Sequence, residues 1–592
     1  MSNNAKKGGK WLDNKLPLCY IERAKLIYFY KGKIIMTQMI TLSSLAKIYA
    51  DLPLDLSHRK CSGNMLKNDT YHFQVAYKSI VKAAKVAMAD DIGLDDVVTV
   101  LPSKLKLKFE SDLGDAVSIR YVDYVPCDRT ADMSNFDACE HPKPGIFPDI
   151  LKPVPERIWG YPDMWRGFWI TIDGSEKDLP VGKHTISVTL EDKDGSDTAS
   201  FEIEILDAKL DKQTLPVTNW LYCDCICNYF GVEFGSDEFW AILKNYIKAA
   251  VKNGVNMILT PVFTPALNTA IGGERLTNQL VDITVKEGEF FFNFDNLVKW
   301  IELCKECDVA YYEITPFFTQ WGCKFAPKVM ATVDGEYKQL YGWDTCGYGD
   351  EYLAFLDKLM PLLVDKLKEN GIFDLCYFHI SDEPTPETME NYIKCADKLM
   401  EYIPKEMFFD AMRSVDIYKA GYVHNPVAAL KDIDPFIEEG IDTLWGYYCQ
   451  CEQHTANRLL AHASYRNRIL GLQLFKYDIK GFLQWALNYY NSHDSLEPID
   501  PYTTSTGYGW VPGGDTYVLY PNADGTVTES LRFCVFADAI RDFTALNMLL
   551  KKYSREELVK MLHFEDLTFH NFLAPHELLE IREKINHMLC EL

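Results

Sequence analysis

From residue 213 onward, short apolar runs alternate with amphipathic segments, and no other feature of the chain restricts the fold as strongly. Eight runs have the length and composition of buried strands, and they lie at residues 220–224, 256–263, 309–315, 375–380, 407–411, 421–424, 443–449 and 482–488. Segments with helical periodicity separate them, such as 237–253, 294–307 and 455–477. Buried strands that alternate with helices indicate a parallel sheet, and eight repeats in ~270 residues match the size of a (β/α)8 barrel. We therefore predict a (β/α)8 TIM-type barrel across residues 213–592, ending in a C-terminal helical extension.

The preceding region, residues 36–212, has a period of two instead. Its strand-like runs lie at residues 70–77, 104–110, 117–125, 167–172, 184–190 and 199–206, with turn residues between them. Short strands at this spacing, with few helices, predict a β-sandwich of roughly 170 residues. The predicted fold class is therefore multidomain α and β, with an N-terminal β-sandwich followed by the barrel.

Residues 1–35 form a basic leader with eight Lys or Arg residues against two acids. Its apolar patch at residues 26–30 is too short for the core of a signal peptide. We expect this leader to be disordered or not native to the protein. The 17 cysteines are scattered without the spacing of a metal site, and we expect buried free thiols in a reducing cytoplasm.

Charge and composition exclude several classes of partner. The formal net charge of −24 disfavours nucleic acid and anionic membranes, which repel a strongly acidic surface. No apolar run reaches the ~18 residues of a membrane span. The 13 histidines are dispersed, without an HxH or HExxH pattern, so we expect neither a metal nor a cofactor. A neutral substrate is compatible with all of these observations.

Two adjacent acids end the fourth predicted strand. The apolar run up to Ile380 stops at Asp382, Glu383 and Pro384. Pro384 cannot donate to a sheet, so the strand ends at the acids, and both can then lie at the carboxyl edge where barrel enzymes hold their catalytic groups. The structural alternative is a turn whose acids only favour the N-terminus of the next helix. His379, in the middle of the run, is expected to be a hydrogen-bonded core histidine rather than a metal ligand.

The last two predicted strands and the loop after them end in aromatic and amide side chains. The candidates at these ends are Trp445, Tyr447, Trp485, Asn488, Asp515 and Tyr517. Aromatic faces stack on the C–H face of a pyranose, while amides and carboxylates bind its hydroxyls. Together with the acid pair, this pattern favours a sugar-cleaving enzyme.

These motifs resemble glycoside hydrolase family 123 and its uncharacterised relatives. The resemblance rests on residues 378–384, 444–447, 481–489, 514–515, 520–521 and 530–532 of the predicted barrel, and on residues 124–126, 145–149 and 169–172 of the sandwich. It extends over nearly the whole of residues 36–550. The motifs of the barrel are the more specific ones.

The resemblance implies a retaining exo-acting β-N-acetylhexosaminidase that prefers GalNAc. Its substrate would be an oligosaccharide or glycoconjugate with a terminal 2-acetamido sugar, whose acetamido oxygen attacks the anomeric carbon to form an oxazoline. By position, Glu383 is the general acid and base, and Asp382 orients the acetamido N–H. In this scheme the walls around the sugar are Trp445, Tyr447 and Trp485, and the hydroxyl contacts are Asn488, Asp515 and Tyr517.

Two alternatives remain open. Glu452 lies three residues beyond the seventh predicted strand, so a two-carboxylate retaining glycosidase could use Glu383 and Glu452 instead. The absence of a carboxylate at the strand end itself, residues 447–449, favours the substrate as the nucleophile. The second alternative is a catalytically inactive relative that binds carbohydrate.

Overall fold

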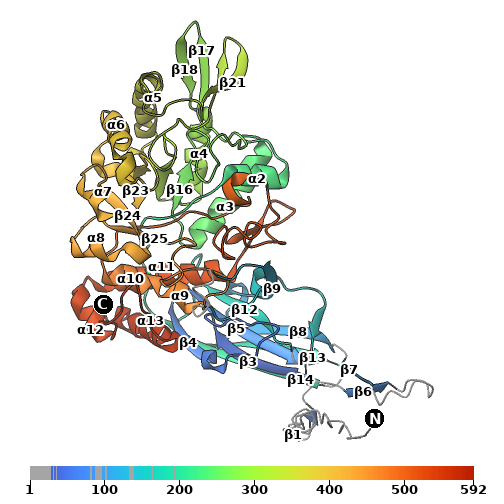
Figure 1. The fold of residues 1–592 in the computed structure, drawn as a ribbon. Helices are drawn as coiled ribbons and strands as arrows, with labels where there is room; N and C mark the ends of the chain where they lie inside the picture. The colour runs from blue at the N-terminus through green and yellow to red at the C-terminus, as the bar shows by residue number, and fades with distance from the viewer. Residues whose placement is uncertain are drawn as a thin grey trace, which may run out of the picture.

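The structure, a computed structural model, describes residues 29–30, 33–34, 37–79, 83–86, 97–100, 103–131, 139–162, 164–192 and 195–592. The N-terminal sheets, in blue and cyan, lie below the strands and helices of the larger C-terminal part (Figure 1). Apart from the short pairing of β1 (Phe29–Tyr30) with β2 (Lys33–Ile34), the predicted leader lies outside the described residues. Among the described residues, every helix is too short or too polar to span a bilayer.

The N-terminal part contains two five-stranded sheets. The first has the order β10-β9-β12-β5-β3 and the second has the order β11-β8-β13-β14-β4. Their bounds are β3 Thr37–Ser43, β4 Ser62–Leu66, β5 Thr70–Ser79, β8 Ser103–Ser111, β9 Val117–Cys127, β10 Gly145–Pro153, β11 Ile158–Gly160, β12 Arg166–Asp173, β13 Gly182–Asp192 and β14 Gly195–Leu206. Alternate residues of the two sheets, such as Phe73, Ile170 and Phe201, share one buried core. This arrangement is the sandwich that the period of two predicts.

The C-terminal part is built on eight parallel strands in the order β22-β19-β16-β15-β26-β25-β24-β23. Their bounds are β15 Val217–Asn219, β16 Met257–Thr260, β19 Tyr311–Ile314, β22 Cys376–Phe378, β23 Phe409–Met412, β24 Asn425–Ala429, β25 Trp445–Tyr447 and β26 Phe482–Gln484. A parallel bridge between Phe378 and Phe408 links the first strand of this order to the last. The sheet is therefore a nearly closed eight-stranded parallel barrel, as the strand-helix alternation predicts.

Helices follow the strands and cover the outside of the barrel (Figure 1). They are α2 Cys223–Phe230, α3 Asp237–Lys252, α4 Asp295–Glu306, α5 Asp350–Glu369, α6 Met389–Met400, α7 Val415–Lys419, α8 Asp434–Glu438, α9 Tyr465–Arg468, α10 Leu470–Lys476 and α11 Leu531–Leu549. The C-terminal extension adds α12 Arg555–Met561 and α13 Pro575–Leu589. Amphipathic helices such as α3 and α5 bury one face on the strands and leave the other in water, whereas α10 and α11 are buried on nearly all sides.

An additional four-stranded sheet, which the sequence does not predict, stands at the end of the barrel farthest from the sandwich (Figure 1). It has the order β18-β17-β20-β21. Its strands are β17 Asp282–Lys286, β18 Glu289–Asn293, β20 Val329–Val333 and β21 Glu336–Tyr341. Two of them come from the connection after β16 and two from the connection after β19. The sheet forms because the hairpin β17–β18 of the first connection pairs with the hairpin β20–β21 of the second, through β17 and β20.

The structure corrects the first predicted strand, which lies at 217–219 rather than 220–224. The side-chain amide of Asn488 accepts from Tyr222 N at 2.9 Å and donates to Tyr222 O at 3.1 Å. These bonds take the place of strand pairing, and α2 begins directly afterwards at Cys223.

Two further predictions are also corrected. The strand predicted at 421–424 begins only at Asn425, after Gly421 ends the turn of α7 with φ of +86°. The helix predicted at 455–477 is limited to α9 and α10.

The sandwich and the barrel are joined by a buried ion pair. Arg532, at the start of α11, donates from Nε and Nη2 to the two carboxylate oxygens of Asp149 on β10, each at 2.9 Å. Tyr520 also donates its hydroxyl to Asp149 at 2.6 Å. Removing one partner of a buried pair leaves an uncompensated charge, at a cost of about 3–5 kcal/mol. The last barrel helix is therefore held in one position against the sandwich.

Candidate active site

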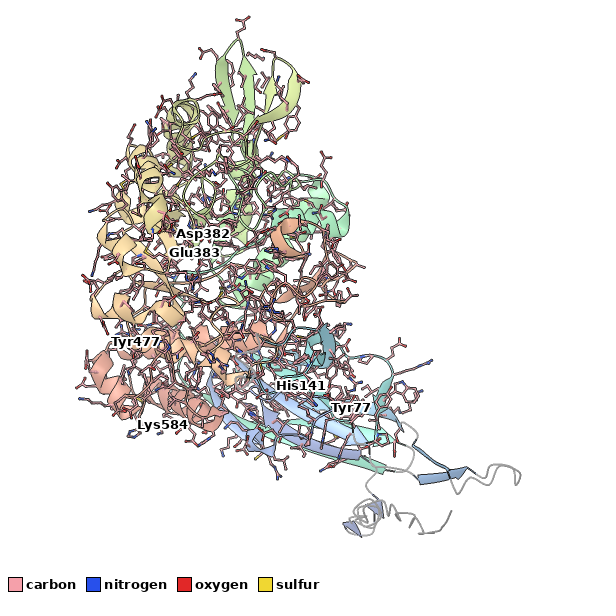
Figure 2. All side chains as sticks on the ribbon, viewed as in Figure 1. Tyr77, His141, Asp382, Glu383, Tyr477 and Lys584 are labelled. Carbon is pink, nitrogen blue, oxygen red and sulfur yellow. The ribbon has the colours of Figure 1, made fainter. Side chains whose placement is uncertain are left out.

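The turn after β22 carries the two adjacent acids. The strand ends at Phe378, and the backbone leaves the extended conformation before Glu383, whose φ is +44°. Residues other than glycine rarely adopt this left-handed conformation, which costs about 1–3 kcal/mol and is found at functional sites. Asp382 and Glu383 are both half-buried, and they lie next to each other within the barrel part of the molecule (Figure 2). The condition under which two consecutive acids can share one site is therefore met.

Neighbouring elements hold this turn through backbone hydrogen bonds. Glu383 N donates to Ala411 O on β23 at 3.1 Å. On the other side, Trp321 N, from the connection after β19, donates to Asp382 O at 2.9 Å. Ser381 Oγ donates to Thr319 O at 3.0 Å in the same connection. The turn is thus attached to β23 on one side and to the connection after β19 on the other, which limits the movement of both acids.

A buried charge network lies directly behind the turn. His379 Nδ1 is 2.9 Å from Asp410 Oδ1, and His379 Nε2 is 2.6 Å from Glu313 Oε1. Trp220 Nε1 donates to Glu313 Oε1 at 2.6 Å, and Tyr392 donates its hydroxyl to Asp410 Oδ2 at 2.6 Å. All five side chains are buried. The expectation that His379 is a hydrogen-bonded core histidine is confirmed.

The network fixes the charge of His379 and positions the backbone of the turn. Burial opposes the imidazolium, but hydrogen bonds to Asp410 and Glu313 raise the pKa of His379 to about 10. A doubly protonated ring donates from both nitrogens, so each of the two carboxylates accepts one of its N–H groups. Asp410 Oδ2 also accepts from the backbone N–H of Ile380 at 3.0 Å and of Ser381 at 3.3 Å. The charged histidine therefore orients the carboxylate that holds the start of the turn.

The environment of the pair also shifts the titration of Asp382. Burial and the negative charge of Glu383 raise the pKa of Asp382 well above its ordinary value, while His379 acts in the opposite direction. Two adjacent acids that share one site cannot both ionise without mutual repulsion. The pair can therefore retain a proton at a pH where a solvent-exposed aspartic acid has lost it.

Tyr447, at the end of β25, is the predicted residue in direct contact with the pair. Its hydroxyl donates to Glu383 Oε1 at 2.6 Å, and only 6% of its surface is exposed. Burial, followed by the charge of Glu383, raises the pKa of Tyr447 well above 10. The phenol remains protonated and is a permanent donor to the Glu383 carboxylate.

Trp485 and Asp515 form a second contact among the predicted residues. Trp485 Nε1 donates to Asp515 Oδ2 at 2.9 Å, and the same oxygen accepts from Gln450 N at 3.1 Å. Burial raises the pKa of Asp515 to about 6, although the nearby Arg458 opposes the shift. Trp485 is half-buried, whereas Asp515 is fully buried. Asp515 therefore orients the indole of Trp485 and connects it to the turn after β25.

Three predicted residues are engaged inside the protein. Trp445 is buried in the barrel, where its ring packs against Tyr377 and Phe409. The amide of Asn488 is used on the backbone of Tyr222, as described above. Tyr517 is fully buried and donates its hydroxyl to Pro501 O at 2.7 Å. The polar atoms of Asn488 and Tyr517 are thus occupied by the chain itself, and a structural role explains these three residues.

Glu452 differs from the acid pair in its surroundings. Only 1% of its surface is exposed, and its Oε2 accepts from Cys449 N at 2.7 Å. Burial raises the pKa of Glu452 to about 7. A carboxyl group that stabilises its own turn and is shielded from solvent is poorly placed to attack a sugar.

Sequence reasoning missed two residues in the connection after β19, Gln320 and Trp321. Trp321, whose backbone N–H donates to Asp382 O, lies beside Asp382 only because β19 and β22 are neighbours in the sheet, a relation that no local pattern reveals. It also missed Arg413, an exposed cation beyond β23. Burial lowers its pKa, but the acidic side chains near it, Tyr447 and Glu383 among them, raise it above its ordinary value. Within the described residues no group of three or more His, Cys, Asp or Glu side chains is arranged to hold a metal.

A parallel barrel that carries an acid pair at the carboxyl edge of one strand is an arrangement compatible with a glycoside hydrolase. The glycoside hydrolase 123 catalytic domain matches residues 220–549, which is more than half of the chain. The chain therefore belongs to glycoside hydrolase family 123.

A solved structure agrees with this assignment at the level of the fold. A family 123 glycoside hydrolase from Clostridium perfringens, studied for its hydrolysis of glycolipid glycans, superposes with a TM-score of 0.68 at 14% identity. The superposition covers 94% of this chain and 98% of that chain. A β-glucuronidase from Parabacteroides merdae has a TM-score of only 0.29 at 11% identity, covering 80% of this chain and 50% of that chain. No curated protein matches the sequence.

Proposed function

We propose that the protein is a retaining exo-glycosidase that releases a terminal β-linked N-acetylhexosamine, preferentially GalNAc, by substrate-assisted catalysis. The observation that carries the proposal is the Asp382–Glu383 turn, in which two neighbouring acids occupy different environments. Tyr447 donates to Glu383. Asp382, by contrast, is subject to burial and to the repulsion of its neighbour. Adjacent acids with separate environments suit two different roles in one reaction.

In the first step Glu383 gives its proton to the glycosidic oxygen. The acetamido oxygen of the substrate attacks the anomeric carbon, the C–O bond to the leaving group breaks, and an oxazoline forms. In the reactive state the proton that the pair retains lies on Glu383, and Asp382, as a carboxylate, accepts the hydrogen bond of the acetamido N–H and stabilises the positive charge that develops on the acetamido group. In the second step the Glu383 carboxylate takes a proton from water, the water oxygen bonds to the anomeric carbon, and the oxazoline opens with retained configuration.

Other residues are assigned supporting roles. Tyr447 stabilises the Glu383 carboxylate between the two steps, because its pKa keeps it a donor. The half-buried indole of Trp485, oriented by Asp515, is the stacking surface for the sugar ring. The His379 network positions the backbone that carries the acids. Preference for GalNAc rests on family membership, and the substrate proposed is an oligosaccharide or glycoconjugate ending in a 2-acetamido sugar.

The test compares an aryl β-glycoside of GalNAc with the aryl β-galactoside, which lacks only the acetamido group. Cleavage of the first substrate and loss of at least about 10³-fold in kcat/KM for the second would support assistance by the acetamido group. Equal cleavage would contradict it. Running the GlcNAc glycoside beside the GalNAc glycoside tests the preference, and a faster rate for GlcNAc would overturn that part of the proposal.

A further inference from the structure

Two cysteines share the turn that follows β25. Cys449 and Cys451 are separated by Gln450 alone, and the turn is closed by a 3.1 Å hydrogen bond from Glu452 N to Cys449 O. A closed turn brings residues two positions apart to the Cα separation that a disulfide spans, about 4.4–6.8 Å. The two thiols also hydrogen-bond to each other. The pair is therefore arranged so that a disulfide can form within this turn.

The two thiols differ in their surroundings. Most cysteines in the described part of the chain are buried, but Cys451 is exposed to solvent and Cys449 is partly buried. The hydrogen bond from Cys449 lowers the pKa of Cys451 to about 6, against the effect of burial. The charges of Lys431 and Arg413 add to this shift, and that of Asp515 opposes it. An exposed, ionised thiol reacts with oxidants, and its protonated neighbour is placed to attack the oxidised sulfur.

A second thiol pair shows which properties distinguish this one. Cys323, in the connection after β19, hydrogen-bonds to Cys395 on α6, but both side chains are fully buried. Burial, followed by this hydrogen bond, raises the pKa of Cys323 well above its ordinary value. A reactive cysteine must be accessible and ionised, so the buried pair is expected to be inert. The pair after β25 has an accessible member.

The residue between Cys449 and Cys451 is bound to the candidate active site. Gln450 N donates to Asp515 Oδ2 at 3.1 Å, and the same oxygen accepts from Trp485 Nε1 at 2.9 Å. A bond between the two sulfurs closes a small ring that contains the Gln450 backbone, and the geometry of a disulfide then dictates how this backbone is oriented. The oxidation state of the pair is thus coupled to the position of Trp485.

We propose that Cys449 and Cys451 form a redox-modification site that reacts with hydrogen peroxide and reversibly lowers the activity of the adjacent site. The Cys451 thiolate sulfur attacks one oxygen of hydrogen peroxide, the O–O bond breaks, and the hydroxide that leaves takes a proton from solvent. The Cys449 sulfur then attacks the sulfenic acid on Cys451, the S–O bond breaks, and the hydroxyl group leaves as water with the proton of the Cys449 thiol.

The electrons balance in this sequence, because the pair of sulfurs loses two electrons and the peroxide gains them. A dithiol reductant reverses the change by thiol–disulfide exchange. The effect on activity rests on the proposed function, whereas formation of the disulfide does not.

The experiment treats the full chain with equimolar hydrogen peroxide, alkylates the remaining thiols and maps all cysteines by mass spectrometry. We expect the disulfide between Cys449 and Cys451 to be the first product and dithiothreitol to remove it. Cys451→Ser should abolish it, and Cys449→Ser should leave a sulfenic acid on Cys451 that dimedone labels. Oxidation of other exposed cysteines at an equal rate, or oxidation of Cys451 to a sulfinic acid without the disulfide, would overturn the proposal.

Cys346 supplies the matched control, because it is also exposed but has no cysteine two residues away. Cys346→Ser should leave the reaction with peroxide unchanged. At pH 7 a limiting amount of iodoacetamide should label Cys451 before Cys346, since the thiolate is the reactive form. Equal labelling of the two would contradict the assignment of Cys451 as the reactive thiol.

Activity measurements test the link to the site. With the aryl β-glycoside of GalNAc, kcat/KM of the oxidised protein should fall about tenfold and recover on reduction, because the wall at Trp485 is displaced. Cys451→Ser should keep the activity of the reduced protein and lose its sensitivity to peroxide. A disulfide that forms without a change in kcat/KM would overturn the regulatory role.

Hydrogen exchange keeps the inference separate from the proposed function, because it needs no substrate. If the wild-type protein cleaves no GalNAc glycoside, the proposed function fails, but faster exchange of the Gln450 amide on oxidation still supports the coupling. Exchange that is the same in the reduced and oxidised proteins would overturn it.

Discussion

Two loops of the barrel place carboxylates beyond the end of a parallel strand, and they use them in opposite ways. After β22, Asp382 and Glu383 are half-buried on a strained backbone. After β25, Glu452 is fully buried on an unstrained turn, where it accepts from Cys449 N. The first loop is held by its neighbours, the second by its own carboxylate. Position at a strand end thus does not distinguish the two sets of carboxylates, and what distinguishes them is whether the protein already uses the carboxylate for its own structure.

The largest effect should come from removing the acid that transfers the proton. Glu383→Gln keeps the shape and the contact with Tyr447, but the amide can neither protonate the leaving oxygen nor activate water. We expect kcat for a substrate with an alkyl or sugar leaving group to fall by about 10³-fold or more. With a nitrophenyl leaving group, which needs little protonation, the first step should be less affected, and pre-steady-state kinetics can separate the two steps. An equal loss on both leaving groups would assign Glu383 another role.

A loss of about 10²–10³-fold is expected for Asp382→Asn, because an amide stabilises the charged acetamido group less than a carboxylate. The raised pKa of Asp382 means that its ionised fraction increases with pH in a range where an ordinary aspartic acid is already ionised. In the wild-type protein kcat/KM should therefore rise with pH on the acid side. In Asp382→Asn this limb should move to lower pH. An unchanged limb in the pH–rate profile would show that Asp382 does not control it.

Tyr447→Phe removes a single donor and should have a smaller effect. In the proposed mechanism the hydroxyl stabilises the Glu383 carboxylate after the proton has moved, and a hydrogen bond to a charged group is worth about 1.5–3 kcal/mol. We expect kcat to fall by about 10- to 10²-fold, with little change in the Kd for free GalNAc. A Kd that rises in parallel with the loss of kcat would instead make Tyr447 a contact of the sugar. The same measurement on Tyr448→Phe, whose fully buried ring lies next in sequence, controls for packing.

The sequence predicts the parts of this molecule that depend on local periodicity. The period of two gave the strands of the sandwich, and the alternation of apolar runs with helices gave the barrel and the acid pair at a strand end. Predictions were wrong where side chains from distant segments determine an element. At Tyr222, for example, the side chain of Asn488 forms the backbone hydrogen bonds that a neighbouring strand would otherwise form. The four-stranded sheet at the barrel end was also missed, because its partners come from two separate loops.

The same distinction applies to the site. Glu383, Asp382 and Tyr447 could be selected because each lies at the end of a recognisable strand. Whether an aromatic residue faces the site or the core depends on its place in the strand: Trp445 begins β25 and is packed inside the barrel, while Tyr447 ends it and reaches Glu383. Trp321 could not be found, because its position beside Asp382 follows from the order of the strands and from a left-handed backbone.

Glu452→Gln should have the smallest effect on activity. It therefore tests whether the carboxylate after β25 has only a structural role. We expect kcat/KM to stay within about twofold of wild type, since the amide oxygen can still accept from Cys449 N. The substitution should instead change how the free energy of unfolding depends on pH. The folded-state pKa of about 7 lies above the ordinary value for glutamic acid, so the folded protein binds more protons than the unfolded chain between these pH values. Unfolding free energy should therefore fall as pH rises through this window.

Because glutamine does not titrate, this pH dependence should disappear in Glu452→Gln, and the variant should be more stable than wild type at pH 8 by about 1–3 kcal/mol. Urea unfolding of both proteins at pH 5 and pH 8 measures the difference. A variant that keeps its stability but loses activity by about 10²-fold or more would reverse the comparison, because it would make Glu452 the second catalytic carboxylate and the oxazoline route unnecessary.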